Sequence, residues 1–268
     1  MTTWKGSSMK KTLITYVYFE RDKKDYRKRD KWRAPAFQDN FRFFLRHGIV
    51  DNDNYHYNFM INNHVCSVDI PESKNISVIK RDNVGYDFGA YSASIRTVNL
   101  DEYDNFIFIN DTMRGPFIPN YIPSKISWVD MFLDKLSDKV VMVGPVFNRG
   151  RIIHIQSSCF GLSRVGLDTC IEAKIFRDPV DYVTTGWKWK KFFKRDYEIT
   201  MTDLFYIAPG MEIKSFIMSG YEELDRRSRK YENPLEVMFI KWVLAVGPQY
   251  GNPQTKKFAE NYTKWMGL

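Results

Sequence analysis

Apolar and polar residues along the chain follow a pattern that predicts alternating strands and helices. Runs rich in β-branched and aromatic residues predict strands at Thr12–Phe19, Tyr55–Ile61 and Ile76–Ile79. Apolar residues spaced three and four apart predict a helix over Ala36–Ile49 that covers the sheet. Because strands that alternate with helices pair in parallel through crossover connections, the pattern predicts an α/β fold with a mostly parallel central sheet flanked by helices.

The stretch Arg81–Pro116 gives the most specific pattern in the chain. A polar turn that contains Gly85 leads into a helix of small residues, and a wholly apolar strand at Phe106–Ile109 follows. An apolar run without alternation is typical of a strand that is covered on both faces. This strand ends at Asn110 and Asp111, so we expect a carboxylate at the carboxyl end of a buried strand, where open α/β sheets bind their ligands.

The second half of the chain predicts a stiff proline loop at Gly115–Pro119, followed by further strands and helices. The strands are expected at Lys139–Gly144 and Ile152–Leu162, and the helices at Ser127–Leu136, Ser163–Ile175 and Pro234–Val246. We expect one domain with a helical C-terminal extension, preceded by a disordered segment at residues 1–9.

Composition narrows the class of protein only partly. With 268 residues and 44% hydrophobic residues, the chain can bury the core of one large domain. The net charge of +8 suits an anionic partner such as nucleic acid, a phospholipid surface or a nucleotide diphosphate. A basic nucleic-acid-binding protein is the alternative class. Because basic residues are scattered among acidic ones and the sequence has no groove-binding motif, we expect no nucleic-acid partner.

Cysteine usage and hydropathy bear on the compartment. The three cysteines show no metal-like spacing and form no disulfide framework, which favours a reducing compartment. No apolar run approaches the roughly 18 residues of a membrane span, and the amino terminus has no signal-type apolar block. We therefore expect a cytoplasmic protein whose membrane contact, if any, is peripheral.

Two short motifs resemble a known family. The residues Asn83–Ala90 (Asn-Val-Gly-Tyr-Asp-Phe-Gly-Ala) and Ile109–Pro116 (Ile-Asn-Asp-Thr-Met-Arg-Gly-Pro) resemble the rhamnan-synthesis-F-like polysaccharide glycosyltransferases. The order of glycine turn, helix, strand and acidic pair is similar to the nucleotide-sugar half of GT-A glycosyltransferases. The resemblance implies a Rossmann-like GT-A fold in which residues 10–120 bind the nucleotide sugar. Residues 121–268 would form the acceptor half and C-terminal helices of the same domain.

The resemblance also implies a divalent metal, Mn²⁺ or Mg²⁺, that neutralises the departing diphosphate. Many GT-A enzymes bind it through an Asp-x-Asp motif, but this chain has Asn110, Asp111 and Thr112, so Asp111 alone is a sure anionic ligand candidate. Asp111 could instead close a strand-end Asx turn or cap a helix. The departure from the motif also keeps open a catalytically inactive relative that retained the fold.

The residues implied for nucleotide-sugar binding lie at strand ends and in the motif: Tyr16, Tyr18, Phe19, Asn62, Asn63, Arg81, Asn83, Gly85, Asp87 and Asn110. An aromatic ring can stack on the base, and an amide can bond to the base edge. Arg81 could pair with a phosphate, or with Asp87 or Asp111. Asp87 could cap its helix or bind a sugar hydroxyl.

The general base is the least defined part. The resemblance favours Glu198, with Asp203 in reserve, as the group that deprotonates the acceptor hydroxyl, although either could be a surface carboxylate without a role. His154 is a metal-ligand candidate or an ordinary strand residue. The aromatic and basic segment Thr184–Arg195 is either an exposed helix face or a lid. Together these patterns predict a glycosyltransferase that moves a sugar, most simply from a UDP-sugar and with inversion, to a glycan or polysaccharide acceptor.

Overall fold

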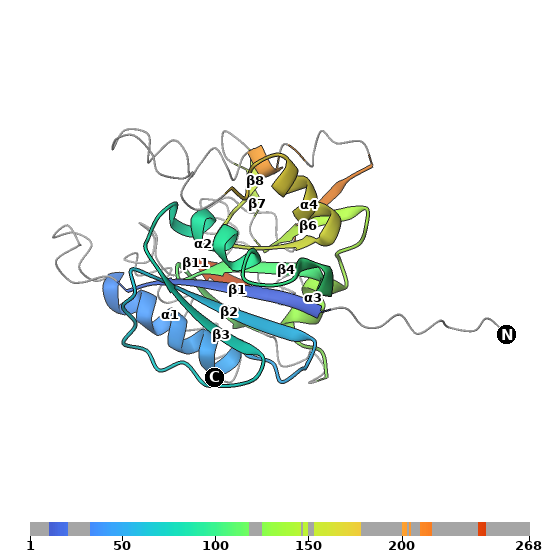
Figure 1. Ribbon diagram of the computed structural model, residues 1–268. Helices are drawn as coiled ribbons and strands as arrows, with labels where there is room; N and C mark the ends of the chain where they lie inside the picture. Colours follow the sequence, from blue (N-terminus) through green and yellow to red (C-terminus); the bar gives the residue numbers. More distant parts are fainter. Residues whose placement is uncertain are drawn as a thin grey trace.

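A central mixed sheet organises the protein. The computed structural model describes residues 11–20, 33–117, 125–145, 147–149, 153–177, 200–202, 204, 210–215 and 241–244. The seven-stranded sheet has the order β10-β6-β9-β4-β1-β2-β3 (Figure 1). Its strands are β1 (Lys11–Phe19), β2 (Tyr55–Asn62), β3 (Ile76–Arg81), β4 (Tyr103–Asn110), β6 (Val140–Gly144), β9 (Cys159–Ser163) and β10 (Glu212–Ser215).

Most strand pairs are parallel, as the sequence predicted. β1 pairs in parallel with β2 and with β4, β2 with β3, and β6 with β10. β9 is antiparallel to both of its neighbours, β4 and β6, so the sheet is mixed at this point. β3 forms one outer edge, and its Val78 and Lys80 are exposed.

Helices cover both faces of the sheet (Figure 1). On one face lie α1 (Arg33–His47) and α3 (Trp128–Leu133), whose Phe41, Phe44, Trp128 and Phe132 share a core cluster with β1, β2 and β4. The other face carries α2 (Tyr86–Ile95) and α4 (Arg164–Glu172), which pack their apolar side chains in a second cluster. The helices predicted at these places are confirmed, although α3 and α4 are shorter than predicted.

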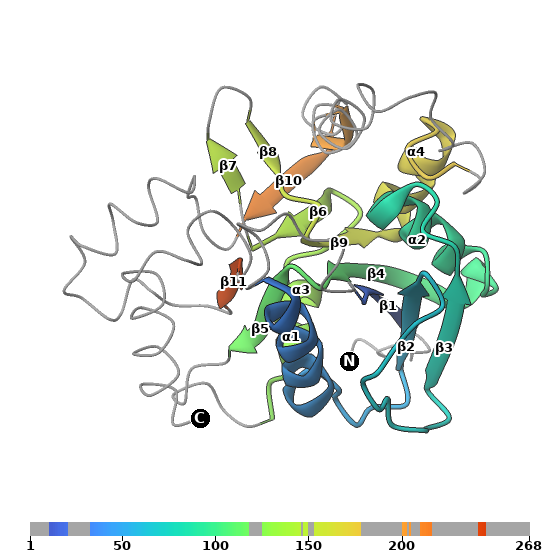
Figure 2. The same ribbon diagram turned by 90° about the vertical axis from the view of Figure 1, so that its left-hand side faces the viewer.

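Three elements differ from the sequence predictions. Gly115 and Pro116 belong to a strand, β5 (Met113–Phe117), which pairs antiparallel with β11 (Lys241–Leu244) beside the main sheet (Figure 2). The predicted helix Pro234–Val246 is therefore wrong over residues 241–244, where β-forming Trp242 and Val243 lie in the extended partner of β5. The expected helical C-terminal extension is not formed there.

The third difference concerns the strand predicted at Ile152–Leu162. The structure divides it into β8 (Ile153–Ile155), which pairs with β7 (Phe147–Arg149), and β9 in the central sheet. The intervening turn gives its carbonyl groups to other elements, because Ser157 accepts from the Tyr91 hydroxyl and Ser158 from the backbone N–H of Asn110. The apolar run is thus interrupted by polar residues that serve the turn.

A buried polar network fixes α2 on the sheet. The hydroxyls of Thr15 and Ser94 lie 2.7 Å apart, and the Asn58 amide donates to the Ser94 and Thr97 hydroxyls at 3.0 Å. At the start of α2, a Cβ on Gly89 would lie 2.1 Å from the carbonyl oxygen of Val84. The helix can therefore approach the preceding turn only because position 89 has no side chain.

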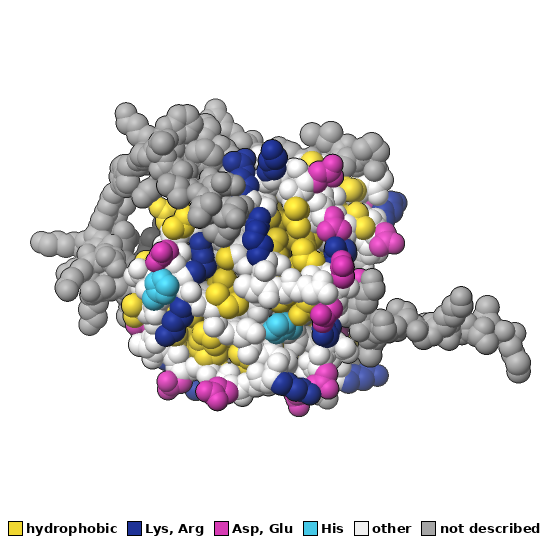
Figure 3. Space-filling view, in the orientation of Figure 1, with side chains coloured by type: hydrophobic (Ala, Val, Ile, Leu, Met, Phe, Trp, Pro, Cys, Tyr) yellow, Lys and Arg dark blue, Asp and Glu magenta, His cyan; other side chains and the backbone are white. Residues whose placement is uncertain are grey.

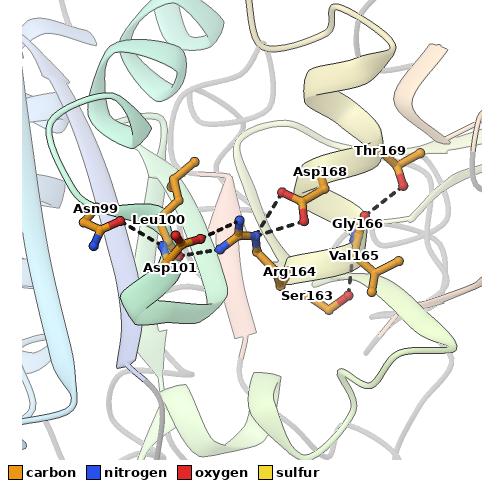
Figure 4. Close-up of polar contacts among 9 residues, drawn as sticks. All are labelled: Asn99, Leu100, Asp101, Ser163, Arg164, Val165, Gly166, Asp168 and Thr169. Carbon is orange, nitrogen blue, oxygen red and sulfur yellow. Dashed lines mark hydrogen bonds and ion pairs between the residues drawn. The ribbon is translucent and has the colours of Figure 1, made fainter.

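Arg164, the first residue of α4, makes a group of polar contacts near the amino-terminal end of β4 (Figure 4). Its Nε atom lies 2.9 Å from both carboxylate oxygens of Asp168, and its Nη atoms donate to the Leu100 carbonyl at 2.5 Å and approach Asp101 at 3.3 Å. Leu100 and Asp101 belong to the short 3₁₀ turn Leu100–Glu102 that precedes β4. Arg164 thus joins the start of α4 to the start of β4.

We expect Gly89→Ala to lower the free energy of unfolding by about 1–3 kcal/mol, because the added methyl group forces the turn away from α2. At a solvent-exposed position inside a helix, the same change from glycine to alanine would instead raise the free energy of unfolding by about 1 kcal/mol. Urea unfolding of the wild type and of Gly89→Ala shows whether the substitution lowers or raises the free energy of unfolding. Lys80→Ala, at an exposed position on β3, serves as the control and should change the midpoint little. Unchanged or raised stability in Gly89→Ala would contradict the close approach.

A second expectation concerns pH. His56 on β2 bonds to the Tyr103 hydroxyl at 2.6 Å and to the Ser77 hydroxyl at 3.1 Å, and burial, aided by Lys11, lowers its pKa from 6.5. The folded state therefore disfavours the imidazolium. Stability from this residue is complete above pH 6.5 and is lost as the pH falls below it.

Urea unfolding of the wild type and of His56→Gln between about pH 8 and about pH 5 measures this effect. The difference in unfolding free energy between the two proteins should shrink as the pH falls. A difference that is constant across this range would contradict the assignment.

Candidate functional site

The carboxyl ends of four neighbouring strands meet at one edge of the sheet. In the parallel registers, Asn110 lies opposite Val17, Phe19 opposite Asn62, and Asn62 opposite Arg81. Figure 2 views the molecule from the side on which these strands end. The structure therefore brings four of the strand-end residues that the sequence singled out to a single edge: Phe19, Asn62, Arg81 and Asn110.

Arg81 connects two segments of this edge. Its guanidinium donates to the Asn62 side-chain oxygen at 2.6 Å and to the Val84 carbonyl at 2.6 Å. Burial lowers the pKa of the guanidinium, against the opposing effect of Asp82, but a guanidinium stays protonated in proteins. Among the described residues no carboxylate lies within ion-pair distance of Arg81, so the alternative pairing with Asp87 or Asp111 is not found. Arg81 is therefore a half-buried cation at the carboxyl end of β3.

The turn at Asp82–Gly85 leads into α2 with unusual backbone angles. Gly85, at φ 72°, is the N-cap of α2, and Tyr86 follows at φ 53°. Asn83 lies partly exposed in this turn. No side chain caps the helix, so Asp87 is not its cap, and that reading of Asp87 is wrong.

Asp87 instead lies in the first turn of α2 and accepts a hydrogen bond from the Asn110 side-chain amide at 2.8 Å. A carboxylate in this position interacts favourably with the helix dipole. The Asn110 side-chain oxygen accepts in turn from the Thr112 backbone N–H at 3.1 Å and from the Thr112 hydroxyl. The end of β4 and the start of α2 are joined in this way.

Asp111 is buried, with 3% of its surface exposed, and it ties three segments together. Its carboxylate oxygen accepts from the Phe19 backbone N–H at 3.0 Å, and its own N–H donates to the Val17 carbonyl. Its carbonyl accepts from the side chain of Asn40 on α1 at 2.9 Å. Asp111 thus fastens the end of β4 to β1 and α1, whereas the bond to the backbone N–H two residues on, which defines an Asx turn, is made by Asn110.

A metal site would need further oxygen or nitrogen ligands close to Asp111. Within the described ranges, no group of three or more His, Cys, Asp and Glu side chains is placed to hold a metal ion. One oxygen of Asp111 also bonds to Phe19. The described residues therefore do not fit a metal site by themselves.

Tyr16 and Tyr18 do not lie where a base could stack on them. Both rings are buried between β1 and α1, where the Phe41 ring centroid lies 5.1 Å from that of Tyr16 and 4.6 Å from that of Tyr18. Burial raises the pKa of both phenols. The two tyrosines are core residues, and of the predicted aromatic group only Phe19, at the end of β1, is partly exposed at the edge.

Some of the other predicted site residues are described by the structure, and others are not. Asn63 is exposed just beyond β2, whereas His154 is buried in β8, which pairs with β7 outside the central sheet. Glu198, Asp203, residues 1–9 and the segment Thr184–Arg195 lie outside the described residues. Both candidates for the general base therefore stay predictions.

Asn40 is a residue that sequence reasoning did not select. It is a buried amide on the face of α1 that packs on the sheet, next to Phe41. A polar residue within the apolar stripe of a predicted helix is the signal that could have identified it, since buried polar groups require partners.

One of the comparisons with known proteins covers this edge. The sequence model of the family described as Rhamnan synthesis protein F matches residues 62–125. Two curated proteins named Virulence protein VirA, from Vibrio anguillarum (strain ATCC 68554 / 775) and from Vibrio anguillarum, are each 46% identical over 96 residues. That segment is 34% of this chain and spans about a quarter of the length of these relatives, 27%.

The surface of the face that carries β3 and α2 is mixed in character: apolar and uncharged side chains lie between the Lys and Arg side chains (Figure 3). None of the helices in the described ranges combines the length and apolar character that a membrane crossing requires.

We expect Asp111→Ala to lower the free energy of unfolding by about 1–3 kcal/mol, because the Phe19 N–H loses its acceptor. Asp111→Asn keeps an oxygen that can accept this bond, so its loss should be smaller. Asp138→Ala, which removes an exposed carboxylate, is the control. Urea unfolding ranks the three variants, and equal stability of Asp111→Ala and the control would refute the fastening role.

Proposed function

We propose that the protein is a glycosyltransferase of polysaccharide synthesis. It takes a sugar from a nucleotide diphosphate sugar, with UDP as the first candidate, and transfers it to a hydroxyl of a glycan or polysaccharide. The donor binds at the carboxyl edge formed by β1, β2, β3 and β4.

One observation carries this proposal. The segment similar to Rhamnan synthesis protein F, residues 62–125, begins at the last residue of β2 and contains Arg81, Asp87, Asn110 and Asp111. The similarity thus covers the polar part of an edge where α/β sheets bind ligands. A match confined to residues of the core would support only a shared fold.

The chemistry of the edge suits a diphosphate. Departure of a nucleotide diphosphate places negative charge on the leaving group, which a positioned cation stabilises. Arg81 offers a planar guanidinium that recognises phosphate oxygens. The start of α2, which has no side-chain cap, presents backbone N–H groups that suit an anion. Asp87 and Asn110, whose side chains are bonded to each other, would bind sugar hydroxyls.

A divalent cation, when bound, would add Lewis-acid stabilisation of the diphosphate. Since the described residues do not form its site, no step is assigned to it, and the test below measures whether donor hydrolysis requires Mn²⁺ or Mg²⁺. Glu198 or Asp203 would accept the proton of the acceptor hydroxyl.

A screen of nucleotide sugars tests the proposal, with donor hydrolysis measured in Mn²⁺, in Mg²⁺ and in EDTA. We expect release of the nucleoside diphosphate from one UDP-sugar above the uncatalysed rate, and a rise of melting temperature with UDP. An oligonucleotide should not raise the melting temperature. Absence of turnover with every donor, in a protein whose melting temperature rises with UDP, would instead identify a catalytically inactive relative.

Arg81→Lys should reduce donor hydrolysis about tenfold or more, because a lysine ammonium cannot bridge Asn62 and Val84 while it faces a phosphate. Lys80→Ala changes the charge of the adjacent exposed residue and should leave the rate near that of the wild type. Equal rates for Arg81→Lys and the wild type would exclude Arg81 from the donor site.

A further inference from the structure

The segment between β2 and β3 borders the carboxyl edge and leaves β2 in an uncommon conformation. Asn63 and His64 have φ angles of 73° and 58°, in the left-handed region that side-chain-bearing residues rarely adopt. The Asn63 N–H donates to the Arg81 carbonyl at 2.8 Å, and His64 lies 2.9 Å from Asp82. These bonds extend the pairing of β2 and β3 beyond the strands and hold the segment on its β3 side.

Glu20 holds the same segment on its other side. One carboxylate oxygen accepts from the Ser67 backbone N–H at 2.5 Å and from the Tyr18 hydroxyl at 3.3 Å. The other oxygen accepts from the Gln38 amide at 3.3 Å, and that amide also lies 3.0 Å from the Ser67 hydroxyl. The network therefore joins the end of β1, helix α1 and the segment after β2.

The position calls for a carboxylate. Three donors from three segments converge on its two oxygens, and an ionised carboxyl group is the side chain that only accepts hydrogen bonds. Such charge-assisted bonds are about twice as strong as neutral ones. A left-handed backbone persists only where its surroundings fix it. Glu20 and the Arg81 pairing are the surroundings that the described residues provide.

We propose that Glu20 is a positioning residue for the donor site. It fixes the segment at residues 63–68 against α1, so that Asn62 and Asn63 stay beside Phe19 where the nucleotide lies. The placement of the nucleotide rests on the proposed function, whereas the fastening of the segment does not.

Cys66 reports on this fastening. It is the neighbour of Ser67 and is partly exposed, whereas Cys159 and Cys170 are buried, so a maleimide reagent reaches Cys66 first. Burial, with a contribution from Glu20, raises the pKa of the Cys66 thiol and slows its reaction. Cys66→Ser confirms which thiol is labelled.

Labelling rates are compared in the wild type, Glu20→Ala and Glu20→Gln. Both variants remove the charge next to Cys66, but Glu20→Gln keeps an oxygen for Ser67. We expect labelling of Glu20→Ala to be about tenfold faster than that of Glu20→Gln, because the segment opens more often. Glu72→Ala, an exposed carboxylate change in the same connection, should label like the wild type. Gln38→Ala supplies a milder variant if Glu20→Ala does not fold, and it should label faster than the wild type.

The donor arm uses the UDP-sugar identified by the screen. Glu20→Ala should raise KM for this donor about tenfold with kcat within about twofold, Glu20→Gln, which keeps one of the two acceptor oxygens, should restore part of the loss, and the donor should protect Cys66 from labelling. Equal labelling of Glu20→Ala and Glu20→Gln would overturn the fastening role. Faster labelling with an unchanged KM would overturn the link to the donor. If the wild type turns over no donor but the labelling rates of Glu20→Ala and Glu20→Gln still differ, the glycosyltransferase proposal is wrong and the fastening role of Glu20 is supported.

Discussion

The hydrogen bonds that begin where the strand ladders end determine the shape of the carboxyl edge. A parallel ladder satisfies backbone groups only along its length, and a buried group left without a partner costs roughly 1–3 kcal/mol. Asp111 supplies an acceptor for the Phe19 N–H, and Arg81 supplies donors for the Val84 carbonyl and for Asn62. The same polar side chains that suggest a binding site are therefore required to finish the sheet.

This double use affects how the site would act. Side chains that already hold one another need little reorganisation when a ligand arrives, which preserves binding energy for the ligand. Asp87 and Asn110 are bonded to each other, and Arg81 is bonded to two segments at once. It also means that a substitution at the edge changes stability and binding together, so measurements of unfolding must accompany measurements of rate.

The sequence predicted the elements whose pattern is local. The unbroken apolar run at Phe106–Ile109 indicated a covered strand, and the turn at Gly85 indicated the start of a helix; both are confirmed. The helix predicted at Pro234–Val246 failed over residues 241–244 because an apolar run suits a strand as well as a helix, and the partner strand β5 lies far away in the sequence.

Site residues were harder to predict, because their partners are distant in the sequence. Glu20 meets Ser67 across 47 positions and Asn40 meets Asp111 across 71, and no spacing in the chain signals either pair. Tyr16 and Tyr18 illustrate the opposite error. An aromatic residue near a strand end is equally suited to a nucleotide base and to the underside of a helix, and only packing against Phe41 decides between them.

The outermost strand carries one more consequence. Among the described strands, β3 has a neighbour on one side only, and such a strand offers a template on which another polypeptide could add. Its exposed Val78 would favour that growth, but the ammonium group of exposed Lys80 would have to leave water first. The exposed charge of Lys80 thus discourages the addition of a strand from another chain to this edge of the sheet.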